Sequence, residues 1–112
     1  MFDPITSRME NYLDLLSARQ KLVASNIANL ATPGYRTRDL DFQFEFESLV
    51  QGGTPTVYQP AGLTVKNDGN NVSLDREARL LSENAIRFNL VSNLIKNELR
   101  AVKQAIDEGK SG

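Results

Sequence analysis

The chain has 112 residues, of which 40% are hydrophobic and 24% charged, a composition typical of one soluble domain rather than of a disordered chain. Its 13 basic and 14 acidic residues give a formal charge of −1, which does not indicate a nucleic-acid partner. Cys, His and Trp are absent, so disulfides, thiolate metal sites and imidazole catalysis are excluded, and we expect no enzyme, no catalytic residue, no metal site and no cofactor.

The N-terminal segment has the apolar spacing of one helix face. It lacks the basic and apolar regions of a cleavable signal peptide, and the chain contains no apolar run long enough for a membrane span. No Gly or Pro falls between Ile5 and Ala31, and apolar residues recur at spacings of four and three. This predicts a helix from residue 4 or 5 to 29. Its packing residues are Met9, Leu13, Leu16, Val23 and Ile27.

Two asparagines, Asn26 and Asn29, precede a strong turn signal. Asn competes for backbone hydrogen bonds and so terminates helices well. Two interpretations stay open: simple capping of the helix, or side-chain amides that hold the following turn in one shape. Within that turn, Pro33 and Gly34 suit the two central positions of type II.

The middle of the chain begins with alternating acidic and apolar residues. Two structures fit this stretch: a strand, and a helix with one apolar face. The strand would place Leu40, Phe42, Phe44 and Phe46 on one face, whereas the helix would align Phe42, Phe46, Leu49 and Val50. The acidic residues Asp39, Asp41, Glu45 and Glu47 are interpreted as a solvated surface rather than a cation site.

Residues 51–71 are rich in Gly, Pro and Asn, which predicts a loop with at most a short hairpin. The expected strand residues in this loop are Val57, Tyr58, Leu63 and Val65.

The last segment predicts a second helix, from about residue 74 to 107. Ser73 suits its N-cap, Asp75 and Glu77 place negative charge in its first turn, and Gly109 is the expected terminator. Apolar residues keep the alternation of four and three over ten positions, which is typical of coiled-coil packing. The packing and assembly residues are Leu81, Ala85, Phe88, Ile95, Leu99, Val102 and Ile106.

This second helix carries further apolar residues outside that row. They are Leu80, Ile86, Leu90, Val91 and Leu94. One partner helix cannot cover both surfaces, so we expect other chains to cover the excess.

The expected fold is mainly α, with two long terminal helices in an antiparallel coiled-coil hairpin and a small irregular or β middle segment. The predicted organisation is one discontinuous helical domain, residues 1–35 and 72–112, with a middle segment of residues 36–71. Such a hairpin suits a structural subunit that assembles through its helices. The alternative is a small adaptor or export chaperone that binds a partner's helix in its groove.

Two stretches of the sequence resemble the flagellar rod and hook protein family. In that family a helix ending in Asn-x-x-Asn is followed by Thr- or Ser-Pro-Gly-Tyr, and the matching positions here are Asn26, Ala28, Asn29, Thr32, Pro33, Gly34 and Tyr35. The start of the second helix is similar to the proximal rod members of the family at Gly69, Asn70, Asn71, Val72, Leu74, Asp75 and Glu77. The resemblance covers residues 1–42 and 68–107, although Phe88 stands where relatives commonly have Tyr.

The resemblance implies a structural subunit of the proximal flagellar rod, exported by the flagellar type III apparatus without signal cleavage. Such subunits polymerise in the periplasm into a hollow helical axle that transmits torque. The implied partners are further copies of the chain, FlgC-like and FliE-like rod proteins, the MS ring and the export apparatus, with no nucleic acid.

Overall fold

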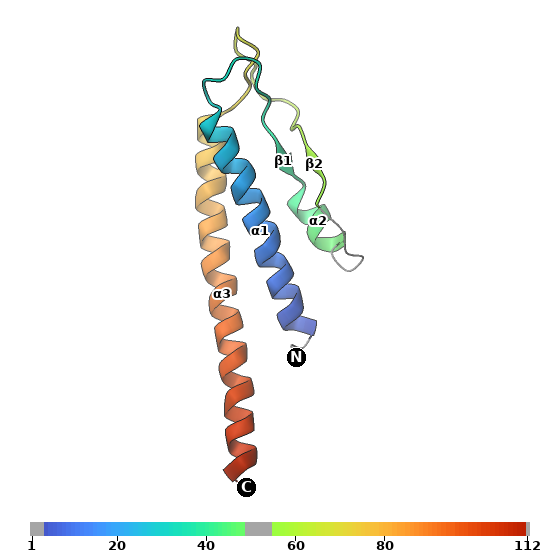
Figure 1. Ribbon diagram of the computed structural model, residues 1–112, viewed down its shortest axis with the longest axis vertical. Helices are drawn as coiled ribbons and strands as arrows, with labels where there is room; N and C mark the ends of the chain where they lie inside the picture. Colours follow the sequence, from blue (N-terminus) through green and yellow to red (C-terminus); the bar gives the residue numbers. More distant parts are fainter. Residues whose placement is uncertain (1–3, 49–54, 112) are drawn as a thin grey trace.

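The structure is a computed structural model that describes residues 4–48 and 55–111. It is mainly helical and elongated, with principal extents of 72 × 27 × 17 Å (Figure 1). The elements are α1 (Pro4–Ala28), β1 (Asp39–Leu40), α2 (Phe42–Ser48), β2 (Val57–Tyr58) and α3 (Leu74–Ser111).

Helices α1 and α3 lie side by side and run in opposite directions, as Figure 1 shows, so the predicted antiparallel helical hairpin is confirmed. α3 has 38 residues and α1 has 25, so α3 is longer by about 20 Å at 1.5 Å per residue. The two helices are joined at one end of the molecule by the segments on either side of the middle region. At the other end α3 continues past the described start of α1 (Figure 1).

The ends of α3 agree only in part with the prediction. Ser73 acts as its N-cap, because its Oγ accepts a hydrogen bond of 3.3 Å from the backbone N–H of Arg76. The expected stop at Gly109 is wrong: α3 continues through this residue to Ser111. A Cβ at Gly109 would meet no atom within 4 Å, so the residue occupies an ordinary exposed helical position and its low helix propensity is insufficient to end the helix.

The middle segment contains both of the structures that its sequence allowed. β1 pairs with β2 in an antiparallel two-stranded sheet, with Asp39 opposite Tyr58 and Leu40 opposite Val57. After β1 the chain enters α2, so the helical alternative holds for residues 42–48. Val57 and Tyr58 are strand residues as predicted, whereas Leu63 and Val65 are not in a strand. Leu49 and Val50 lie outside the described residues.

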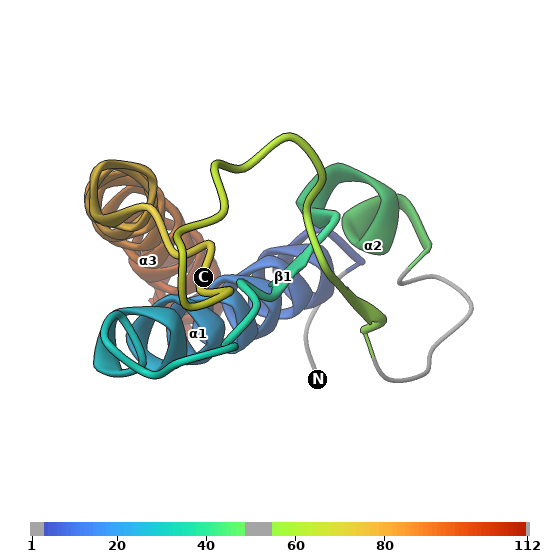
Figure 2. The same ribbon diagram turned by 90° about the horizontal axis from the view of Figure 1, so that it is seen from above.

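A small hydrophobic core lies between α1 and the middle segment. Leu15 and Leu16 of α1 pack there with Leu40 and Phe42. Tyr12 meets the rings of Phe42 and Phe46 edge to face, with centroids 5.0 and 5.2 Å away. α1 is therefore covered on one side by α3 and on another by β1 and α2, an arrangement seen along the helix axes in Figure 2.

α3 contacts α1 through a different row of residues from the predicted one. The buried positions of α3 include Glu77, Leu80 and Asn84. The predicted apolar row lies beside this contact and stays half exposed. Its relative exposures are 40% at Leu81, 46% at Phe88, 44% at Leu99, 48% at Val102 and 53% at Ile106.

On α1 the predicted packing residues are covered: Leu16 and Val23 are buried, and Met9, Leu13 and Ile27 are half-buried. The apolar row of α3 is therefore not buried against α1 in the single chain. Polar pairs occupy that position instead, with Asn84 Nδ2 donating to Gln20 Oε1 at 3.2 Å and Arg87 to the Tyr12 hydroxyl at 3.1 Å.

Candidate functional site

The two stretches that resemble the flagellar family meet at the joined end of the helical hairpin. Thr32–Tyr35 forms the predicted type II turn: the N–H of Tyr35 donates to the carbonyl of Thr32 at 3.2 Å, and Gly34 has a φ of +74°. A second turn begins at Lys66, whose carbonyl accepts from the N–H of Gly69 at 2.9 Å. We call residues 66–73 the lead-in loop of α3.

Gly34 and Gly69 bring these two turns into contact. Gly69 has a φ of +87°, which favours glycine, and a Cβ there would lie 3.4 Å from the Cα of Gly34. The N–H of Gly34 donates to the carbonyl of Asp68 at 2.8 Å. The positive φ of both glycines shapes the two turns, and the turn after α1 thus rests directly on the loop before α3.

Asn70 and Asn71 extend this contact with their side chains. Asn70 is fully buried, and its Nδ2 donates to the carbonyls of Asn29 and Thr32, each at 2.8 Å. Asn71 Oδ1 accepts from the backbone N–H of Thr37 at 2.6 Å. The lead-in loop therefore holds the segment that follows α1 through hydrogen bonds to its backbone.

Asn26 uses all the hydrogen-bonding capacity of its amide and joins three segments. Its Nδ2 donates to the backbone carbonyl of Arg38 at 2.8 Å and to Glu77 Oε1 at 2.7 Å. Its Oδ1 accepts from the Tyr35 hydroxyl at 3.0 Å and from the N–H of Arg38 at 3.1 Å. Asn26 is 1% exposed, and it holds residues 35–38 and the first turn of α3 against α1. The interpretation in which an amide fixes the chain path is confirmed for this residue.

Asn29 has the simpler capping role. Its N–H and its Nδ2 both donate to the carbonyl of Ser25, and its Oδ1 accepts from the Thr32 hydroxyl at 3.0 Å. These bonds are local to the end of α1. The two asparagines of the Asn-x-x-Asn pattern thus have different functions, one between segments and one within the helix end.

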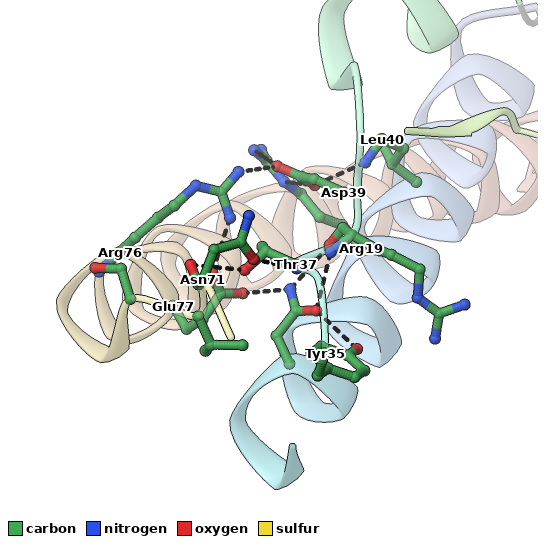
Figure 3. A network of polar contacts seen from close by, with 12 residues as sticks. Arg19, Tyr35, Thr37, Asp39, Leu40, Asn71, Arg76 and Glu77 are labelled. Carbon is green, nitrogen blue, oxygen red and sulfur yellow. Dashed lines mark hydrogen bonds and ion pairs between the residues drawn. The ribbon is translucent and has the colours of Figure 1, made fainter. Parts of the chain in front are cut away.

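Four charged side chains from three elements form a neutral cluster beside Asn26 (Figure 3). Arg19 of α1 makes a two-point contact with Asp39 of β1, at 3.0 and 2.9 Å. Arg76 bridges Asp39 and Glu77, with N–O distances of 2.5 and 2.8 Å. We call these four residues, with Asn26, Tyr35, Thr37, Asn70 and Asn71, the polar junction.

The polar junction is electrostatically complete. Asp39 is 1% and Glu77 0% exposed, and each carboxylate faces at least one guanidinium. Burial lowers the pKa of Arg76, but the hydrogen bonds and negative charges of Glu77 and Asp39 raise that pKa above its ordinary value overall. Arg76 therefore stays charged at any physiological pH. Removal of one partner would leave a buried charge uncompensated, which is strongly destabilising.

The polar junction connects elements of the chain to one another through satisfied hydrogen bonds and ion pairs. Within residues 4–48 and 55–111, no group of three or more His, Cys, Asp or Glu is placed to hold a metal ion. In the same part of the chain every buried side-chain nitrogen or oxygen has a hydrogen-bond partner. The junction can fix the angle and register of α1, α3 and β1 relative to one another.

The sequence interpretation missed part of this site. Arg19 and Asp39 are 20 residues apart, and Asp39 and Arg76 are 37 residues apart, so no local spacing in the sequence reveals these pairs. Thr37 was missed for the same reason. Conversely, some signature residues lie outside the junction: Ala28, Pro33, Leu74 and Asp75 are exposed, and Val72 is buried without a polar role.

Within the described residues, no helix has both the length and the apolar character needed to cross a membrane. The family model described as flagella basal body rod protein matches residues 13–36, which include the end of α1 and the type II turn.

The flagellar basal body rod protein FlgB of Escherichia coli (strain K12) is 29% identical to this chain, over 87% of the chain and 88% of that protein. FlgB of Borrelia hermsii is 28% identical over 95% of the chain and 98% of that protein. FlgB of Buchnera aphidicola subsp. Acyrthosiphon pisum is 30% identical over 79% of the chain and 83% of that protein. The similarity extends over most of the chain and of each relative, and the chain belongs to the FlgB family of flagellar basal body rod proteins.

Proposed function

We propose that the chain is a structural subunit of the flagellar basal body rod, and that its helices join neighbouring subunits into a hollow helical axle that transmits torque. The observation that carries this proposal is the apolar surface of α3. Nine large hydrophobic residues of this helix are at least 40% exposed in the single chain: Leu74, Leu81, Ile86, Phe88, Leu90, Leu94, Leu99, Val102 and Ile106. Apolar surface of this kind, exposed on two sides of one helix, is typical of protein–protein contact.

A groove along the helix pair supports contact with further helices. It has a volume of about 410 Å³, and Leu16, Leu81, Ala85 and Phe88 contribute its apolar wall. Lower on α3 the same apolar row continues with the half-buried Ile95 and the exposed Leu99, Val102 and Ile106. An apolar helix face with a spacing of 3.5 residues fits such a surface.

The polar junction has a supporting role in this proposal. It holds the two helices at one angle, so that each copy presents the same apolar surface to its neighbours. The helical part, residues 1–35 and 72–112, is then the assembly domain, and residues 36–71 form a small outer segment. The proposed partners are copies of the chain, FlgC-like and FliE-like rod proteins and the MS ring, reached by export through the flagellar apparatus without signal cleavage.

Leu99→Asp tests the assembly surface. Leu99 is 44% exposed in the single chain, so the variant should fold, but a neighbour covering this position would bury an unpaired charge. We expect loss of rod assembly and of swimming when the variant is the only copy in the cell. Asn97→Asp adds the same charge at an exposed position of the same helix and should leave swimming intact. Normal swimming with Leu99→Asp would contradict the assignment.

A further inference from the structure

The middle segment carries an exposed aromatic surface that the helix contacts do not use. We call β1, α2 and β2 together the wing. Phe44 of α2 is 60% exposed and Tyr58 of β2 is 45% exposed. Both line a shallow hollow of about 270 Å³, with Thr56, Asp41 and Glu45 at its edge. Phe44 points away from the core that holds Phe42 and Phe46, so the fold of the single chain leaves this aromatic surface free.

The wing is also the most acidic part of the chain. Residues 39–65 contain four carboxylates and no Lys or Arg. Asp39 is neutralised by Arg19 and Arg76, and the N–H of Thr56 donates to Glu45 at 2.9 Å. Asp41 lines the hollow and is exposed, and Glu47 is exposed one helical turn beyond Phe44, where it accepts a hydrogen bond from Gln43. A complementary surface must therefore offer positive charge and groups that pack on aromatic rings.

The lower half of α3 offers such a surface. Lys96, Arg100 and Lys103 are exposed and are spaced four and three residues apart, so they share one face of the helix. At about 100° per residue this face lies about 120° around α3 from Asn84, which contacts α1. The basic row thus points away from α1, and its side chains border the apolar row of Leu99 and Val102.

The acidic wing and the basic row lie on opposite sides of the molecule. In Figures 1 and 2 the wing stands on one side of α1 and α3 on the other. The wing therefore cannot reach the basic row of its own chain, but a copy placed alongside brings its α3 toward the wing. A contact between two different surfaces of identical copies is heterologous, and it continues from copy to copy.

We propose that the wing of one copy docks on the basic row of α3 of a second copy, with Phe44 and Tyr58 packed against Arg100 and its neighbours and Glu47 facing their charges. The proposal rests on the proposed self-assembly of the chain. It adds a lateral, charge-dependent contact that is separate from the apolar row of α3.

Sedimentation velocity of the purified full chain, over a concentration series at low salt, tests this contact. Glu47→Lys and Arg100→Glu each place like charges across the contact and should weaken self-association about tenfold. The double variant carries Lys at position 47 and Glu at position 100, so opposite charges face each other again. Its self-association affinity should return to within about threefold of that of the unchanged protein. Phe44→Ser, at an exposed position, should weaken association without changing the circular dichroism of the chain. Raising the salt concentration should weaken association of the unchanged protein.

Glu10→Lys is the matched control, because it makes the same charge change at an exposed position of α1 and should leave association unchanged. A double variant that associates no better than the single ones would overturn the docking contact, as would a chain that remains monomeric at every concentration. Neither result depends on incorporation into rods, so the proposed rod function is judged separately by swimming of the Leu99→Asp strain.

Discussion

At position 26, the hydrogen-bonding atoms of the side chain determine which residue type can stand there. A primary amide has two donors and two acceptor lone pairs, and here each is used between different segments. Asp at this position would lose both donors and would bring a second carboxylate against Glu77. Ser or Ala could not reach Arg38 and Glu77 together. The buried position leaves no water to replace the lost bonds.

Asn26→Ala should lower the free energy of unfolding by about 2–4 kcal/mol, since Glu77 Oε1 and the backbone groups of Arg38 lose the partners that Asn26 supplies. Urea denaturation of the purified chain, followed by circular dichroism, measures this loss. Asn29→Ala removes only bonds within the end of α1 and should cost about 1 kcal/mol or less. Equal losses in the two variants would show that Asn26 has no special role between segments.

At the scale of elements, the turns around the junction are determined by backbone conformation. Gly69 combines a positive φ with close contact to Gly34, whereas Gly62 has a φ of +81° but open space around its Cα. The two positions therefore share a left-handed conformation and differ in whether a Cβ would have a neighbour.

Gly62→Ala should cost about 1 kcal/mol of unfolding free energy from the left-handed conformation alone. Gly69→Ala should cost about the same, because its Cβ would lie 3.4 Å from the Cα of Gly34, which is an ordinary van der Waals distance. Thermal and urea unfolding of both variants give the comparison. A clearly larger loss at Gly69 would show that the turn after α1 has no room for a methyl group on the lead-in loop.

Elements that depend on residues close together in the sequence were predictable, and contacts between residues far apart in the sequence were not. The helical spacing and Ser73 placed α1 and the start of α3, and Pro33 and Gly34 indicated the type II turn. The row of α3 that contacts α1 was not predictable, because apolar spacing shows where a helix has apolar surface but not which chain covers it. Here Glu77 and Asn84 occupy the contact within the chain, and the apolar residues are left for other contacts. Arg19 and Asp39 meet only because α1 and β1 pack together.

At the scale of the whole molecule, buried contacts concentrate near the joined end of the hairpin. The described residues of α3 that are buried extend no further than Asn84. From Leu99 to Lys110 every residue is exposed. A helix end of this length gains little from propensity alone in water, so its order depends on neighbours that cover it. The chain thus combines a self-sufficient junction with a long extension of α3 that has its partners outside the chain.

Deletion of residues 99–112 separates these two parts. The removed residues make few contacts with the rest of the chain. The deletion should therefore shift the midpoint of urea unfolding less than Asn26→Ala does. Assembly should nevertheless be lost, since the variant lacks the exposed residues Leu99, Val102 and Ile106. Urea unfolding of the purified variant and swimming of a strain that carries only this variant measure the two effects. A deletion that unfolds the junction would mean that the end of α3 stabilises its own chain, and a deletion strain that swims would mean that the rod does not need this surface.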